Sequence, residues 1–134
     1  MRKIVGKTLF AAFVDTENVA DQSVYIAKVN DKTYGTKYIL ALLNSRLLTW
    51  YFRVKANEFD VLFPQIKVTE FKELPIKKAE SQKPFIIIVD KILAAKKRDS
   101  EADTNLLEQQ INSLVYELYG LTKEEIQVVE GEKL

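Results

Sequence analysis

Three polar side chains near the middle of the sequence have the types and the spacing to follow a row of phosphate groups. Arg46, Thr49 and Arg53 are three and four residues apart, so on a helix they would fall on one face. Two guanidinium groups and a hydroxyl can all donate hydrogen bonds to phosphate oxygens. An ordinary solvated helix face has the same pattern, and the sequence leaves both interpretations open.

Two further pairs of side chains could contact a nucleic acid. Gln65 and Lys67 flank Ile66, and an amide can bond bidentately to adenine while a lysine reaches guanine or a phosphate. Lys3 and Lys7 would lie on a basic N-terminal strand. The alternatives are a structural strand with outward polar residues for the first pair, and an edge strand protected from aggregation for the second.

Aromatic side chains offer another possible contact with nucleic acid. Tyr34, Tyr38, Trp50 and Tyr51 could stack on an extruded base. Trp50 and Tyr51 also belong to the apolar stripe of the predicted helix, which favours a place in the core.

The residue types that are missing exclude most enzyme chemistry. The chain has no His and no Cys, which removes Ser-His-Asp and Cys-His catalysis and cysteine-ligated zinc. Its four glycines are scattered, so no glycine-rich loop can hold a nucleotide cofactor. Glu58, Asp60, Glu70 and Lys72 have the types of a metal-dependent nuclease site, but their spacing is unspecific and a solvated face is the better interpretation. We expect no catalytic residue, metal ligand or cofactor site in this chain.

Local patterns place these candidates on a small α/β (α+β) domain. Residues 3–14, 24–29 and 66–69 have strand-like composition or alternation. Apolar residues recur with helical spacing from 37 to about 54, after Thr36 as an N-cap. We therefore expect a small β-sheet packed on one main helix.

The C-terminal part has a different pattern, and a polar linker predicts a boundary between domains at 1–80 and 81–134. Pro84 is suited to begin a helix, Gly120 to end one, and Thr122 to open a capping box. These signals predict an antiparallel helical hairpin. A heptad-like apolar row along its second helix would dock on a partner domain or on a second copy; it consists of Leu107, Ile111, Leu114 and Leu118.

Charge is distributed unevenly along the chain. Residues 1–80 contain 13 Lys and Arg against 9 Asp and Glu, whereas residues 81–134 contain 7 against 10. A basic front would suit nucleic acid and an acidic back would suit a protein partner, although chance also produces a difference of this size. No apolar run is long enough to span a bilayer, so we expect a cytoplasmic protein without a membrane contact.

Several segments together carry a resemblance to a known family. These segments are Phe10 to Phe13, Tyr38 to Ser45, Phe63 to Lys67, Leu74 to Ile76, Pro84 to Lys97, Leu114 to Thr122, and Val129 to Gly131. The combination of Leu42-Leu43-Asn44-Ser45 with the later Leu-Tyr-Gly-Leu-Thr run is distinctive. On these segments the chain resembles the C-terminal specificity (target-recognition) region of TaqI-like and Eco57I-like type II restriction-modification enzymes that methylate adenine in DNA.

The resemblance implies recognition of duplex DNA by a non-catalytic module. In that family a methyltransferase domain flips and methylates adenine with S-adenosylmethionine, and some members add a nuclease domain, which would use Mg²⁺. The long C-terminal helices are similar to spacer helices that dock methyltransferase subunits. This chain lacks the Asn/Asp-Pro-Pro-Tyr/Phe motif of methyl transfer, so catalysis would belong to another domain or subunit.

A different class of function remains open on the sequence. The chain could be a protein-interaction or dimerisation module with no DNA affinity of its own, and its modest net charge of +1 favours that alternative.

Overall fold

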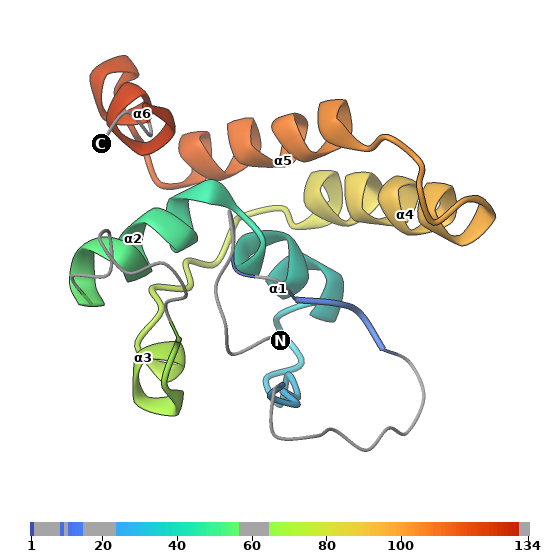
Figure 1. Cartoon of the computed structure of the whole chain (residues 1–134), viewed down its shortest axis with the longest axis horizontal. Helices are drawn as coiled ribbons and strands as arrows, with labels where there is room; N and C mark the ends of the chain where they lie inside the picture. The colour runs from blue at the N-terminus through green and yellow to red at the C-terminus, as the bar shows by residue number, and fades with distance from the viewer. Residues whose placement is uncertain (2–8, 10, 15–23, 57–64, 132–134) are drawn as a thin grey trace.

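The structure is a computed structural model, and it describes residues 1, 9, 11–14, 24–56 and 65–131. Within these residues the chain forms six α-helices, arranged as Figure 1 shows. They are α1 (Thr36–Leu43), α2 (Arg46–Ala56), α3 (Val68–Lys72), α4 (Lys83–Arg98), α5 (Asn105–Leu118) and α6 (Lys123–Glu130).

The expected small β-sheet is wrong, because the described part of the chain is helical and contains no strand. Val24 and Gln65 form isolated β-bridges only. Met1 and Tyr25 exchange two backbone hydrogen bonds of 2.7 Å each, as opposite residues of antiparallel strands do. Residues 24–29 are therefore strand-like in composition without a ladder, since β propensity is expressed only where a neighbouring strand supplies one.

The strand expected at residues 66–69 is also wrong, and a local hydrogen bond explains the outcome. The Glu70 carboxylate accepts from the backbone amide of Lys67 at 2.8 Å, which satisfies a donor at the start of α3. The short helix that follows takes up Val68 and Thr69.

The single helix expected from 37 to about 54 is two helices, because the chain breaks at Asn44 and Ser45. The Ser45 hydroxyl donates to the carbonyl of Leu42 at 2.7 Å and accepts from the amide of Leu48 at 3.3 Å. The first bond competes with the helical pattern of α1, and the second caps the start of α2.

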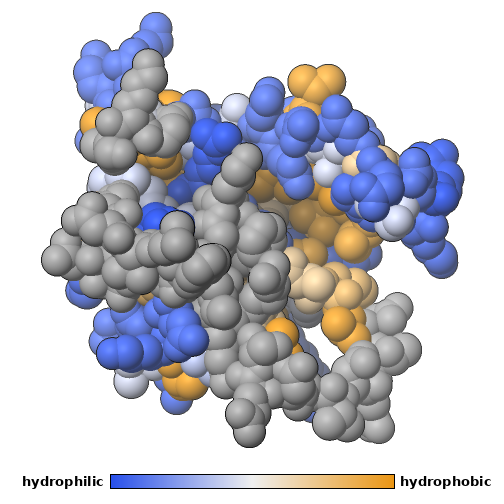
Figure 2. Space-filling view, in the orientation of Figure 1, coloured by the Kyte–Doolittle hydropathy of each residue, from blue (hydrophilic) through white to orange (hydrophobic). Residues whose placement is uncertain are grey.

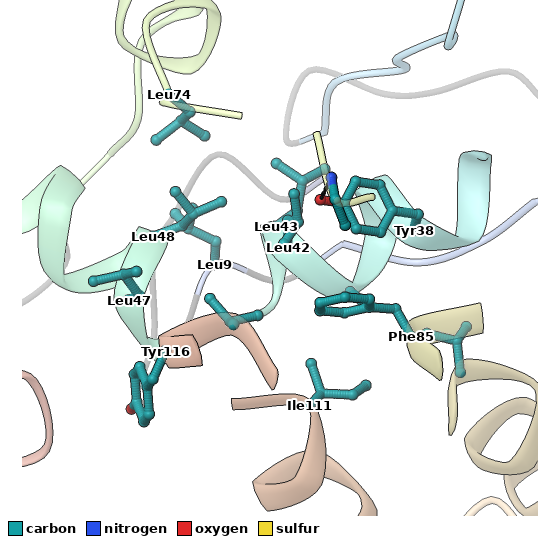
Figure 3. Packing of buried hydrophobic residues seen from close by; sticks show 14 of the residues in the cluster. Leu9, Tyr38, Leu42, Leu43, Leu47, Leu48, Leu74, Phe85, Ile111 and Tyr116 are labelled. Carbon is teal, nitrogen blue, oxygen red and sulfur yellow. Dashed lines mark hydrogen bonds between the residues drawn. The ribbon is translucent and has the colours of Figure 1, made fainter. Parts of the chain in front are cut away.

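One hydrophobic core joins α1 to the C-terminal helices. Helix α1 packs on α4, α4 packs on α5, and α2 packs on both α5 and α6. In Figure 3, Tyr38 of α1 lies beside Phe85 of α4, with their rings edge to face at 5.0 Å. Helices α4 and α5 lie side by side, joined by residues 99–104 (Figure 1). The core therefore draws residues from both sides of position 80, where the sequence predicts a domain boundary.

Two tyrosines, one buried and one partly buried, hold the segment that links α3 to α4. The Tyr38 hydroxyl donates to the carbonyl of Lys77 and accepts from the amide of Ala79 at 3.1 Å. The Tyr119 hydroxyl donates to the carbonyl of Pro75 and accepts from the amide of Lys77 at 3.1 Å. Burial raises the pKa of both Tyr38 and Tyr119, so both hydroxyls keep their protons to a higher pH than an exposed tyrosine does.

Candidate nucleic-acid interface

Helix α2 begins with a hydrogen bond supplied by a distant part of the chain. Arg46 is the first residue of α2, and its backbone amide donates to Oδ1 of Asn112 on α5 at 3.0 Å. A first-turn amide has no acceptor within its own helix, so this side chain satisfies a group that would otherwise need water. The bond ties the start of α2 to α5 and so places the Arg46 side chain, which is exposed.

The expectation that Thr49 faces solvent beside Arg46 and Arg53 is wrong. Thr49 is only 4% exposed. Its hydroxyl accepts from the backbone amide of Leu9 at 2.8 Å and donates to the carbonyl of Ser45 at 3.2 Å. Residues on one helix face can differ in exposure, and Thr49 is the member of this row that the rest of the chain buries.

Asn44 holds the same N-terminal segment two residues further along. Its side-chain amide accepts from the backbone amide of Ala11 at 2.8 Å and donates to the Ala11 carbonyl at 3.0 Å. The amide group thus replaces a peptide unit of a neighbouring strand, because it offers one donor and one acceptor side by side. Asn44 also donates to the carbonyl of Leu40 at 3.2 Å.

A groove of about 1050 Å³ lies between α2 and α5. Figure 2 shows, on one face of the molecule, hydrophobic residues in a hollow that hydrophilic residues border. The apolar part of the groove comes from residues 11–13, α1, α4, α5 and α6: Ala11, Ala12, Phe13, Leu40, Ala41, Val89, Ile92, Leu93, Ile111 and Val129. The side chains from α2 that line it are Arg46, Thr49, Trp50 and Arg53. The polar side chains from α5 that line it are Asn105, Glu108, Gln109 and Asn112.

The structure places both predicted arginines on the groove. Arg46 is exposed and Arg53 is partly buried, and they are seven residues apart on α2. At about 1.5 Å of rise per residue, their backbone positions are about 10.5 Å apart along the helix. The helix therefore presents two cations along one open wall.

The aromatic residues that could stack on a base contribute to the core. Trp50, Tyr51 and Tyr34 are partly buried and pack against the core, and Tyr38 is completely buried. Among the described residues, the indole Nε1 of Trp50 is a buried donor without a hydrogen-bond partner.

Gln65 and Lys67 lie apart from the groove. Both are exposed on either side of Ile66, which is 1% exposed. The Tyr25 hydroxyl donates to the carbonyl of Ile66 at 3.0 Å, and the Tyr25 ring stacks with that of Phe71. The two polar side chains thus stand outward from a fixed point of the backbone. The predicted contacts Lys3 and Lys7 lie outside the described residues.

The apolar row predicted for docking lies largely within this chain's own packing. Ile111 is 7% exposed and belongs to the core, and Leu114 and Leu118 pack against it. Leu107 is partly buried. Leu106, which the heptad pattern leaves out, is 75% exposed.

Asn44, Asn112 and the polar row of α5 are the site residues that the sequence interpretation missed. Asn44 stands in the Leu-Leu-Asn-Ser segment, and an Asn-Ser pair inside an apolar helix pattern is a signal of a helix boundary. The α5 residues recur at spacings of three, one and three, which marks a single helix face. The bond from Arg46 to Asn112 spans 66 residues, and no local pattern indicates it.

The described residues form neither a cluster of metal ligands nor a membrane-spanning helix. They contain no group of three or more His, Cys, Asp or Glu side chains that could hold a metal ion. Within the same residues, every helix is too short or too polar to cross a membrane.

Comparison with known proteins places the front of the chain in a family. Residues 1–76 match the model of the TaqI-like C-terminal specificity domain, as the resemblance in the sequence suggests. No curated protein and no solved structure matches the chain. The match includes α1, α2 and α3, and it ends before α4, α5 and α6. Since the matched residues make up more than half of the chain, the protein belongs to the family of TaqI-like C-terminal specificity domains.

Proposed function

We propose that this chain recognises a target sequence on duplex DNA, as the specificity module of a type II restriction-modification system that methylates adenine. Family membership supports a target-recognition role. The observation that carries the proposal to particular residues is the pair Arg46 and Arg53, which line one wall of an open groove. Two guanidinium groups in a row can hold successive parts of a phosphate backbone.

The distribution of charge along the chain also favours DNA contact on the side of α1 and α2. Residues 24–56 contain six Lys and Arg against one acidic residue, Asp31. Residues 99–131 contain eight Asp and Glu against one basic residue, Lys123. The phosphate groups of a polyanion would therefore lie on the side of α1 and α2 rather than against the acidic side chains of residues 99–131.

We also propose further DNA contacts by residues that are not among those lining the groove. Gln65 and Lys67 would reach base edges or a phosphate, and Lys3 and Lys7 would add phosphate contacts. Thr49 is withdrawn from this set, because its hydroxyl is buried and bonded within the chain.

Methyl transfer would take place in another part of the system. A methyltransferase domain or subunit would bind S-adenosylmethionine, and a nuclease part, where one exists, would bind Mg²⁺. This chain would contribute target recognition alone, and it would act in the cytoplasm, where the DNA is.

The phosphate contacts are tested by a double substitution with a matched control. Arg46→Ala with Arg53→Ala should weaken binding to every duplex alike. It should also make the log–log dependence of affinity on salt shallower by about 1.8, since each phosphate contact contributes about 0.9. Arg98→Ala removes an exposed arginine at the end of α4 that does not line the groove, and it should leave the slope unchanged. Equal slopes for the double variant and the control would exclude the phosphate role.

A second candidate is a protein-interaction module without DNA affinity. Leu106, exposed on α5, and the acidic end of the chain support it, because both suit a protein surface better than a polyanion. Its partner would be a methyltransferase part or a second copy of the chain. Sedimentation velocity over a hundredfold range of concentration tests the second copy, and a dimer that forms while no duplex binds would favour this candidate.

A further inference from the structure

Two helices face the groove with the same spacing and opposite chemistry. On α2 the lining residues stand at positions i, i+3, i+4 and i+7, beginning with Arg46. On α5 the polar lining residues stand at the same intervals, beginning with Asn105, and Ile111 lines the groove beside them. One turn-by-turn row on each helix thus forms one wall of the groove.

The α5 wall is unsuited to phosphate and suited to base edges. It carries three side-chain amides and one carboxylate, Glu108, and it has no Lys or Arg. A carboxylate repels a phosphate but can accept a hydrogen bond from the amino group of cytosine. An Asn or Gln amide can bond bidentately to the N6 and N7 edge of adenine. The α2 wall, with its two arginines, has the opposite preference.

We propose that Asn105 and Gln109 on α5 contact base edges of the target and contribute to sequence discrimination. This inference rests on the proposed function, because it takes the duplex backbone to lie on Arg46 and Arg53. If the backbone lies on that wall, the amide row is brought beside the same duplex, since both walls border one groove. Both amides are on exposed residues, and among the described residues their side chains have no hydrogen-bond partner.

Asn112 has a separate part in this arrangement. Its Oδ1 is used by the backbone amide of Arg46, so it is a positioning residue that fixes the distance between the two walls. Asn105 lies two turns and Gln109 one turn before it on the same helix, and neither side chain is used in this way. This assigns a DNA contact to α5, which lies beyond residues 1–76 that match the family.

The test compares two adjacent glutamines of α5. The 134-residue chain selects its preferred duplex from a random pool, and anisotropy then measures the affinity for that duplex and for a random one. Gln109→Ala should weaken binding to the selected duplex at least fivefold and leave the random duplex unchanged, because a bidentate amide–base contact discriminates by roughly 5- to 150-fold. Gln110→Ala, on an exposed residue outside the groove, should change neither affinity. Alanine is a better helix former than glutamine, so both variants should fold.

A second variant, at Asn105, tests the same contact between α5 and the bases. Asn105→Ala should likewise reduce the preference for the selected duplex. Equal affinities of Gln109→Ala and Gln110→Ala for the selected duplex would overturn the α5 contact, and so would an equal loss for selected and random duplexes. If these results occur while Arg46→Ala with Arg53→Ala still weakens all binding, the proposed function stands and the α5 contact alone fails. A wild-type chain that binds no duplex would overturn both.

Discussion

Asn44 is predicted to anchor the N-terminal segment to the helices, and Asn44→Ala tests this role. The substitution removes three hydrogen bonds, two with the backbone of Ala11 and one with the carbonyl of Leu40. Each is worth roughly 0.5–1.5 kcal/mol net, and partly buried groups of Ala11 lose their partners. We therefore expect a loss of about 2 kcal/mol in the free energy of unfolding.

Urea denaturation followed by circular dichroism measures this loss, with two further variants as comparisons. For a chain of this length, about 2 kcal/mol corresponds to a fall in Tm of about 7 °C. Asn44→Asp keeps the acceptor for the Ala11 amide, but it places a carboxylate oxygen where the amide nitrogen donates to the carbonyls of Ala11 and Leu40. It should therefore destabilise the protein at least as much as Asn44→Ala. Asn30→Ala, on an exposed loop residue, should stay within about 0.5 kcal/mol of wild type. An Asn44→Ala variant as stable as Asn30→Ala would refute the anchoring role.

Two more predictions concern stability. Because burial raises the pKa of Tyr119 above its ordinary value, the unfolded state loses its tyrosine protons first, and stability should fall as the pH rises above about 10. Tyr119→Phe should make that fall in the free energy of unfolding shallower, and an identical pH profile would contradict the role of this burial. Gly120 has φ +68° after α5, where its amide donates to Glu117 and that of Leu121 donates to Tyr116. Gly120→Ala should therefore lower the free energy of unfolding by about 1 kcal/mol in thermal denaturation. Ser113→Ala, on the exposed face of α5, should cause no loss. Equal stabilities of the two variants would argue against a turn that requires glycine.

Local signals predict the C-terminal helices well. Proline near the start of α4, glycine after α5 and the Thr122–Glu125 capping box before α6 all act within one helical turn. Such signals depend on backbone hydrogen bonds between near neighbours, so they can be read without knowledge of the rest of the fold.

The front of the chain is less predictable because its structure depends on distant partners. Residues 24–29 have the composition of a strand, yet a ladder requires a neighbour that no local pattern guarantees. The break at Asn44 and Ser45 depends partly on Ala11, more than thirty residues away. Helical periodicity alone continues across that break, and this is why one helix was expected where two are found.

In the candidate site, too, local patterns predict some features, whereas others depend on distant parts of the chain. Periodicity places Arg46 and Arg53 on one helix face correctly, and both line the groove. It cannot show that Thr49, on the same stripe, is buried and bonded to the backbone amide of Leu9. It also cannot show that α5 supplies the opposite wall, since the pairing of α2 with α5 arises from the tertiary packing of the core.

Binding of wild-type chain to a random duplex, measured by fluorescence anisotropy from about 20 to about 200 mM salt, tests DNA recognition most directly. With at least two phosphate contacts, from Arg46 and Arg53, affinity should fall with a log–log slope of about −1.8 or steeper. The absence of binding at the lowest salt, or a slope near zero, would contradict the assignment of this chain as a DNA-reading module.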